Sequence, residues 1–432
     1  MHKRTTKSIR LSRFATMPPN SPTNNLPKRT IVSRVGWIAL FACVYAVLGL
    51  SILQTTTQNG HYTAFWPMGG VAIAFLYLLG LDLWPGVLIG AIVANYLIGT
   101  PLLPSLFMGF GNTLEAVLGA WLLQRSRTFS PKISKINDAT AIIFYAGILA
   151  SFCSGFFGAL GLLVAHVIES KHFWPTLGVW WSGNTLGTLV VTPAILAWAN
   201  SGQPKMSRRQ QLECASVFII GGGLAWMIFC KPQSDAWFIP MPFLVFFFIT
   251  WAALRFSQRV ATSFVFLVTL ITVWGSLHGL GVFGDPTDRS AWDGVQRTQI
   301  FIIVGTIVSM LVAATTTSLF ERGQRLENSE RRYRQLFNSG PDPLWIYSPE
   351  TQVILAVNEC AITRLGYTRG EFRFPRARFA IYAPRDLANS RQHESAPRQS
   401  TPAGPLSFQW PNIHCCKKTI QSIPAAETRR RP

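Results

Sequence analysis

The chain has 432 residues, of which 49% are hydrophobic and only 13% are charged, and it carries 15 Trp and 30 Phe. Because a soluble chain carries about a quarter of its residues as charged side chains, this composition is typical of a membrane protein. The formal net charge is +20, but the basic residues lie in the tails and short loops, where membrane proteins place them. The sequence has no basic face with interleaved aromatic residues, so it does not predict nucleic-acid binding.

Residues 1–34 form a basic, polar stretch without the apolar core of a signal peptide, which predicts a disordered cytoplasmic tail. The seven cysteines are scattered, with no C-x-x-C pair and no histidine at metal-ligand spacing. The sequence therefore predicts neither a disulfide framework nor a metal site, and it identifies no cofactor.

The region 35–320 is predicted to be an all-α polytopic membrane bundle of about ten transmembrane helices. A hydrocarbon core of about 30 Å needs about 20 apolar residues of helix. The predicted spans are 35–53, 64–80, 83–99, 102–124, 139–168, 173–200, 212–230, 236–254, 258–281 and 296–320. The second and third are short and are joined by Leu81-Asp82 alone, which fits a tight helical hairpin or a re-entrant pair.

The distribution of Lys and Arg predicts the orientation of this bundle. With the N-terminus inside, the inner segments hold seventeen Lys and Arg residues and the outer segments hold four, Lys171, Lys231, Arg289 and Arg297. Cytoplasmic loops are the basic ones, so both termini of this multi-pass chain are predicted to face the cytoplasm.

Glu115 is the main polar feature inside a predicted span. A carboxylate at the bilayer centre is disfavoured by about 2.5–3.5 kcal/mol on insertion scales, so this helix face should point into the bundle or a wet cavity. Asn112 lies beside it, and Asn184 stands in a second Gly-Asn-Thr-Leu string that hints at internal pseudo-symmetry. Glu115 is either a ligand or proton site or a buried, hydrogen-bonded structural glutamate, and the sequence leaves both open.

Trp-Pro pairs stand at the start of three apolar runs, at residues 66–67, 84–85 and 174–175. Proline is tolerated in the first helical turn and Trp prefers the membrane interface, so these pairs predict helix starts with aromatic anchors. Gly69-Gly70 follows the first pair and predicts a close helix contact, because small residues let helices approach.

Three stretches carry a resemblance to a known family. FWPMGGVAIAFLYLLGLDLWPGVLIGAIVANYL, GNTLEAVLGAWLL and WWSGNTLGTLVVTPAILAW resemble the bacterial membrane-associated sensor domain MASE1, over about residues 35–320. The matching elements are W-P-x-x-G at Trp66, Pro67 and Gly70, G-N-x-x-E at residues 111–115, and the stretch ending at Thr192-Pro193. The family often has an acidic residue at the position of Asn184. The resemblance implies a sensory input module of the kind that precedes histidine kinases and cyclic-di-GMP enzymes.

Residues 321–337 are predicted to form a coupling helix after the last span. Leu319, Leu326 and Tyr333 are seven residues apart, which is a short heptad pattern. A dimerising coiled coil and a solvated juxtamembrane helix are both open.

Residues 338–392 resemble the start of a PAS domain. LWIYS and VILAV are short β-rich runs, Asn358 can cap a following helix, and Gly366 ends that helix before Tyr367. Beyond Phe372 the pattern of long strands is missing, so the PAS-like α+β segment is expected to be incomplete. Residues 393–432 are expected to be disordered or frameshifted, with His414, Cys415 and Cys416 incidental rather than metal-binding.

The predicted function, which the resemblance implies, is that of a bacterial inner-membrane sensory or signal-transduction receptor fragment, related to two-component systems. It is expected to lack its own kinase or cyclase output and so not to be an enzyme. Its expected partners are the lipid bilayer, an unknown small-molecule or membrane-protein signal, and a second copy through the coupling helix. The residues expected to line or shape the site are Asn112, Glu115, Asn184, Trp66 and Pro67.

Two other classes of function remain as alternatives. A secondary transporter or channel is compatible with ten spans, helix breaks and one membrane acid. A membrane enzyme would have to use His166, Glu169 or His278, which lie at membrane borders without a nucleophile or ligand set nearby.

Overall fold

The computed structural model describes residues 30–58, 62–200, 206–232, 241–284, 291–348, 354–366 and 368–370. The chain divides into a membrane unit, residues 1–320, and a second unit, residues 321–432. Predicted features at residues 1–29, Arg289, and His414 to Cys416 lie outside the described residues, as does the chain from residue 371 onward.

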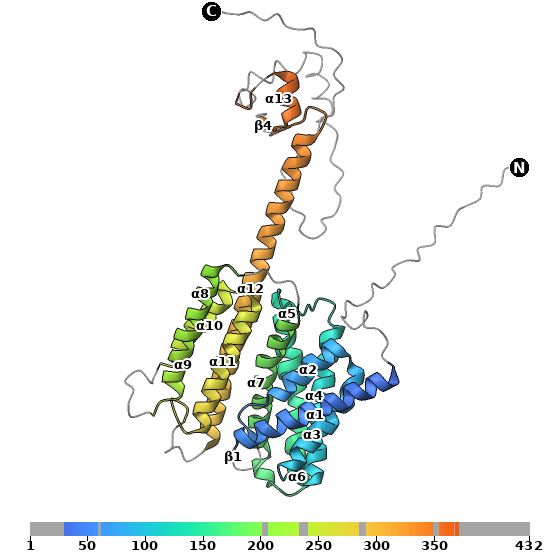
Figure 1. Cartoon of the computed structure of the whole chain (residues 1–432), viewed down its shortest axis with the longest axis vertical. Helices are drawn as coiled ribbons and strands as arrows, with labels where there is room; N and C mark the ends of the chain where they lie inside the picture. The colour runs from blue at the N-terminus through green and yellow to red at the C-terminus, as the bar shows by residue number, and fades with distance from the viewer. Residues whose placement is uncertain are drawn as a thin grey trace, which may run out of the picture. The chain divides into compact units, whose positions relative to one another are not determined.

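Helices build the membrane unit (Figure 1). Its first seven α-helices are α1 (Ile31–Thr56), α2 (Pro67–Leu79), α3 (Trp84–Leu97), α4 (Leu102–Arg125), α5 (Ile136–Ala141), α6 (Ser151–Val164) and α7 (Phe173–Ala199). The remaining ones are α8 (Arg208–Ser216), α9 (Gly222–Phe229), α10 (Leu244–Arg255), α11 (Gln258–Leu277) and α12 (Ala291–Ser339). Short elements complete it: β1 (Thr57–Gln58), β2 (Tyr62–Thr63), the 3₁₀ turns η2 (Leu81–Leu83) and η4 (Ser170–His172), and the π-helical segments η3 (Ile142–Ala150) and η5 (Val217–Gly221).

A helix or a continuous helical run covers most of each predicted span, but ten membrane crossings are not confirmed. Among the described residues, six runs are long and apolar enough to cross a membrane: 31–54, 102–125, 136–164, 208–229, 258–277 and 294–339. The segments 67–79, 81–97 and 244–255 are apolar but shorter. Crossing by these three and by α7 stays a prediction, because α2 is only 13 residues long and α7 carries many polar residues.

Two apolar cores share α7 and α12. The first gathers side chains from α1 to α5 and η3, and the second gathers side chains from α7, η5, α9, α10 and α11. Leu189 of α7 and Met310 of α12 belong to the first core, while Val190 of α7 and Phe301 of α12 belong to the second. Helices α7 and α12 therefore join the two halves of the membrane unit.

Contacts between helix ends show which loops lie on the same side of the bundle. At the start of α1, Arg34 forms an ion pair with Asp82 of η2 at 3.0 Å. Near the end of α4, the Gln124 amide donates to the Tyr77 carbonyl of α2 at 3.2 Å. Arg259 of α11 donates to the Asn200 carbonyl just beyond α7. All of these positions belong to the side on which the sequence places the basic loops.

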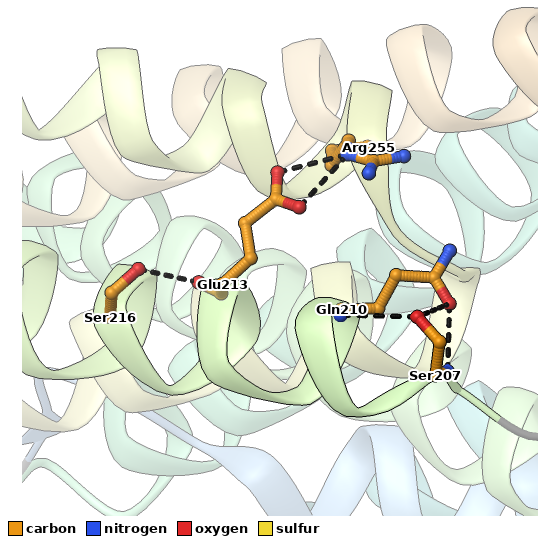
Figure 2. Close-up of polar contacts among 5 residues, drawn as sticks. All are labelled: Ser207, Gln210, Glu213, Ser216 and Arg255. Carbon is orange, nitrogen blue, oxygen red and sulfur yellow. Dashed lines mark hydrogen bonds and ion pairs between the residues drawn. The ribbon is translucent and has the colours of Figure 1, made fainter.

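Glu213 and Arg255 make the corresponding contact in the second half. The Arg255 Nε atom lies 2.9 Å and 3.1 Å from the two Glu213 carboxylate oxygens, which joins α8 to α10 (Figure 2). Ser207 caps α8, because its hydroxyl accepts from the backbone N–H of Gln210. In return, the side-chain carbonyl oxygen of Gln210 accepts from the backbone N–H of Ser207. This capping box explains why α8 begins where it does.

Helix α12 is a single helix of 49 residues. It contains both the last predicted span and the predicted coupling helix at 321–337. Beyond the apolar part it carries three Glu–Arg pairs four residues apart, at 321–325, 327–331 and 330–334. Such pairs support an exposed helix, because residues at this spacing are neighbours on its surface.

The second unit contains a two-stranded antiparallel sheet after α12. β3 (Trp345–Tyr347) pairs with β4 (Ile354–Val357), and α13 (Glu359–Leu365) follows. Asn358 caps α13 by accepting from the Ala361 N–H at 2.8 Å, and it also accepts from the Leu344 N–H at 3.0 Å. Gly366 ends the helix in the left-handed conformation, with φ of 72°. Both strands, the cap and the helix end confirm the sequence prediction.

Candidate functional site

Glu115 lies at the centre of a polar contact among α4, η3, α6 and α7. Its side chain is fully buried. The Ser151 hydroxyl, at the start of α6, donates to Glu115 Oε1 at 2.6 Å, and the Thr188 hydroxyl of α7 donates to the same oxygen at 3.1 Å. Three helical runs that are far apart in the sequence are therefore joined through one carboxyl oxygen.

The start of α2 covers the carboxyl group. A Cβ atom added at Gly69 would lie 2.8 Å from Glu115 Oε1, so a larger residue here would have to displace the carboxyl group. Gly70 lies against α7 in the same way, because its added Cβ would lie 2.7 Å from the Gly187 carbonyl oxygen. The predicted close helix contact at Gly69-Gly70 is confirmed, and one of the two glycines touches Glu115 itself.

Trp66 and Pro67 set the entry of α2 into this contact. Pro67 is the first residue of α2, as the position of proline predicts. The Trp66 N–H donates to the Gly183 carbonyl of α7 at 3.3 Å, and an added Cβ at Gly187 would lie 1.8 Å from the Trp66 carbonyl oxygen. Trp84 and Trp174 are 44% and 72% exposed, whereas Trp66 is only 5% exposed. The interface-anchor prediction is therefore wrong for Trp66, which packs inside the bundle.

The two Gly-Asn-Thr-Leu strings converge on the segment that links η3 to α6. The Ser154 hydroxyl donates to Asn112 Oδ1 at 2.7 Å, and the Thr185 hydroxyl donates to the Gly147 carbonyl at 2.8 Å. Asn112 and Asn184 are each 7% exposed, and Asn184 lies one helical turn before Thr188. Of the candidate residues, Asn112, Glu115, Trp66 and Pro67 have contacts that tie them to this region, and Asn184 is on α7 beside it. Their role in binding a ligand stays a prediction.

Sequence reasoning missed Ser151 and Thr188, the two direct partners of Glu115. Thr188 is four residues after Asn184, so the helical period places it on the same face of α7. Ser151 follows nine π-helical residues, and π-helical turns recur at functional sites because they shift the direction of the next side chains. The position of Thr188 could have been predicted from the period, whereas the π-helical segment leaves no clear sequence signal.

Three buried polar atoms on this side of the bundle lack a hydrogen-bond partner within the described part of the chain. They are Glu115 Oε2, the Tyr45 hydroxyl of α1 and the Trp66 indole nitrogen. The Tyr45 ring packs edge-on to the Trp66 ring at 6.4 Å between centroids, and Tyr45 lies within electrostatic range of Glu115. Buried polar atoms are rarely left unpaired, so the surroundings of Glu115 need a physical explanation.

Gln299 of α12 connects the same region to the long helix. It is fully buried, and its amide donates to the Ala64 carbonyl at 3.0 Å while its carbonyl oxygen accepts from the Ser182 hydroxyl at 2.6 Å. Ala64 is two residues before Trp66, and Ser182 precedes Gly183, whose carbonyl binds the Trp66 N–H. A chain of backbone and side-chain contacts therefore runs from the start of α2 to α12.

The residues considered for enzyme or metal chemistry are not brought together. Glu169 forms an ion pair with Lys171 at 2.7 Å, and the His278 ring stacks on Trp274 at 4.3 Å. Across the described ranges, no three His, Cys, Asp or Glu side chains are grouped so that they could hold a metal ion.

Comparison with known proteins identifies both parts of the chain. The MASE1 family model matches residues 37–320, and a PAS domain model matches residues 331–397. The probable diguanylate cyclase DgcF of Escherichia coli O157:H7 is 26% identical over 260 residues, which are 58% of this chain and 52% of that protein. The chain therefore aligns with about half the length of this curated relative. No solved structure matches.

The matched segment 37–320 contains Glu115 with all of its contacts and makes up more than half of the chain. The PAS match confirms the resemblance seen around Asn358 and Gly366. MASE1 is a membrane-associated sensor domain, so the membrane and signal-transduction assignments are also confirmed. The chain is a member of the MASE1 family, and its membrane sensor domain is followed by a PAS domain.

Proposed function

We propose that this chain is the input part of a bacterial inner-membrane signalling receptor, in which the region around Glu115 receives the signal. The observation that carries this proposal is the buried carboxyl that joins α4, α6 and α7 and is touched by α2. Intramembrane acids are costly, and they are usually kept for a function. Residues 1–432 would receive and pass on the signal without catalysing a reaction.

The route to the second unit is proposed to run through α7 and α12. Ligand binding beside Glu115 would change the contact between the start of α2 and α7. Gln299 binds both the segment that leads into α2 and Ser182 of α7, so α12 would respond to that change. Because α12 continues without a break to Ser339, its motion would reach the residues matched by the PAS model. Such a ligand acts by favouring one of two arrangements of the bundle.

The orientation is proposed to place both termini in the cytoplasm. Support comes from the charge bias and from the contacts of Arg34 with Asp82, Arg255 with Glu213, and Arg259 with Asn200, which gather basic side chains on one side. Cytoplasmic loops are enriched in Lys and Arg.

A homodimer through α12 is proposed as the assembly of the receptor. Leu319, Phe320, Leu326 and Leu336 are 60% to 68% exposed in the single chain. Their apolar surface is available to the same helix of a second copy, and the Glu–Arg pairs lie on the same length of helix.

The test is to replace Glu115 by Gln in a chimera that carries a working cyclase domain after the PAS segment. The variant keeps the size of the side chain but cannot ionise, and it replaces one carboxyl oxygen by an amide nitrogen, so we expect basal output to change several-fold at equal membrane expression. Glu169→Gln is the control, because Glu169 is exposed and forms an ion pair with the exposed Lys171. Unchanged output in Glu115→Gln would leave Glu115 as a structural group.

The cyclase activity in the name of the relative belongs to a protein with which this chain aligns over about half its length. A cyclase is accordingly the output that we propose for the chimera rather than an activity of this chain. Transport, the other class of function, would require flux into proteoliposomes that is lost in Glu115→Gln.

A further inference from the structure

The two oxygens of the Glu115 carboxyl have opposite hydrogen-bond environments. Oε1 accepts from two hydroxyls, Ser151 and Thr188, whereas Oε2 is buried and has no partner in the described part of the chain. An ionised carboxylate has two equivalent oxygens that both attract donors, but a protonated acid has one carbonyl oxygen that accepts and one hydroxyl that donates. The contacts of Glu115 fit the protonated form.

The helices that surround Glu115 supply no positive charge. Along their full length, α2, η3, α6 and α7 contain no Lys, Arg, His, Asp or Glu. Helix α4, helix α1 and the elements packed against α4 contain nine other titratable side chains. On α4 and the elements packed against it they are Arg125, Tyr77, Asp82, Tyr96, Tyr145 and Cys153, and on α1 they are Arg34, Cys43 and Tyr45. Asp82 is paired with Arg34 at the helix ends. Of these side chains, Tyr45 and Cys153 are in electrostatic range of Glu115. A protonated phenol and a protonated thiol carry no charge, so neither supplies a cation.

The α1 side chain in electrostatic range of Glu115 is that of Tyr45. Its hydroxyl is fully buried beside Trp66 and makes no hydrogen bond to either carboxyl oxygen within the described residues, so Oε2 has no donor there to stabilise a negative charge. If Oε2 is ionised, it remains a bare negative charge within a membrane helix bundle.

We propose that the ligand of this site is a proton, and that Glu115 is a neutral carboxylic acid in the arrangement seen here. Loss of the proton breaks the Oε2–H bond, leaves the electron pair on the carboxylate and releases H⁺ to water. The charge thus created lies against Gly69 and drives α2 away from α4, because a solvated or cation-paired position is then more stable. The consequence for signalling rests on the function proposed above, but the protonation itself does not.

Infrared spectroscopy of the full chain in lipid nanodiscs tests the protonation directly. A protonated acid has a carbonyl stretch that is separate from the bands of a carboxylate. At neutral pH we expect this band in the wild-type protein and not in Glu115→Gln. Raising the pH should convert it into carboxylate bands in one step. A wild-type spectrum with Glu115 in carboxylate bands alone at neutral pH would overturn the proposal.

Two further variants keep the test decisive. Glu213→Gln is the matched control, since Glu213 is paired with Arg255 and its replacement should leave the acid band intact. Thr188→Val removes one donor from Oε1, so it should shift the acid band to higher frequency and assign it to Glu115 even if Glu115→Gln folds poorly. An acid band that ignores Thr188→Val would count against the assignment.

The chimera separates this inference from the proposed function. If the infrared spectrum shows the acid band of Glu115, but the output of the chimera changes neither with pH nor in Glu115→Gln, the proton site is supported and the sensory role of Glu115 is contradicted. Carboxylate bands together with an altered output in Glu115→Gln would support the sensory role and overturn the proton.

Discussion

Two acidic side chains of the membrane unit are held in opposite ways. Glu213 lies at the end of the bundle, where Arg255 binds both of its oxygens and about a quarter of its side chain is exposed. Glu115 lies inside the bundle, where two hydroxyls bind one oxygen and the surrounding helices carry no cation. Fold and orientation alone explain the ion pair at the bundle end, whereas the presence of an acid in the bundle interior needs a further reason.

The difference extends to the backbone. Around Glu115 the helices approach so closely that a Cβ atom at Gly70 or Gly187 would meet backbone atoms of the facing segment. Around Glu213 the contact between α8 and α10 is made by the long side chains of Glu213 and Arg255 (Figure 2). A close interior contact has few arrangements open to it, so a charge change there should be felt by several helices at once.

The largest expected effect comes from filling the close contact. Gly187→Val places a side chain where the added Cβ would already lie 1.8 Å from the Trp66 carbonyl oxygen, and a backbone atom cannot move aside cheaply. We expect the folded membrane unit to be lost, measured as aggregation in detergent size-exclusion chromatography.

Gly223→Val is the control for that substitution. Gly223 is exposed on α9, and an added Cβ there meets nothing within 4 Å. This variant should elute as the wild type does. Equal behaviour of the two variants would show that the contact between α2 and α7 is not as close as described.

A smaller effect is expected from Thr188→Val, which removes a donor to Glu115 without changing the shape of the side chain. Hydrogen bonds between membrane helices contribute about 0.6 to 2 kcal/mol, so we expect a moderate drop in the free energy of unfolding in detergent. Thr306→Val is the control, because the Thr306 hydroxyl donates within its own helix, to the Ile302 carbonyl at 2.7 Å. A loss no greater than that of the control would remove Thr188 from the interior contact.

The smallest effect is expected at the bundle end. Glu213→Gln weakens a pair with Arg255 that is screened by water, so the melting temperature should fall less than in Thr188→Val. The difference from the wild type should shrink further at high salt. A larger loss than in Thr188→Val would reverse the comparison between the two acids.

Local rules in the sequence predicted much of the second unit and of the helix starts. Asn358 and Gly366 mark the two ends of α13, and Pro67 and Pro85 stand in the first turns of α2 and α3. These predictions succeed because capping and proline geometry depend on a few neighbouring residues. The same local rule misplaced Trp66, since its preference for the interface is weaker than the packing that buries it.

The sequence predicted an apolar helical membrane protein with its basic loops on one side and with an acid, Glu115, within a span. These properties follow from composition, charge and helical period, which are read along the chain. Only the tertiary structure decided that Ser151 and Thr188 bind one oxygen of Glu115, that Gly69 covers it, and that Gln299 connects this region to α12. Such contacts join residues far apart in sequence, and helix packing rather than any local preference brings them together.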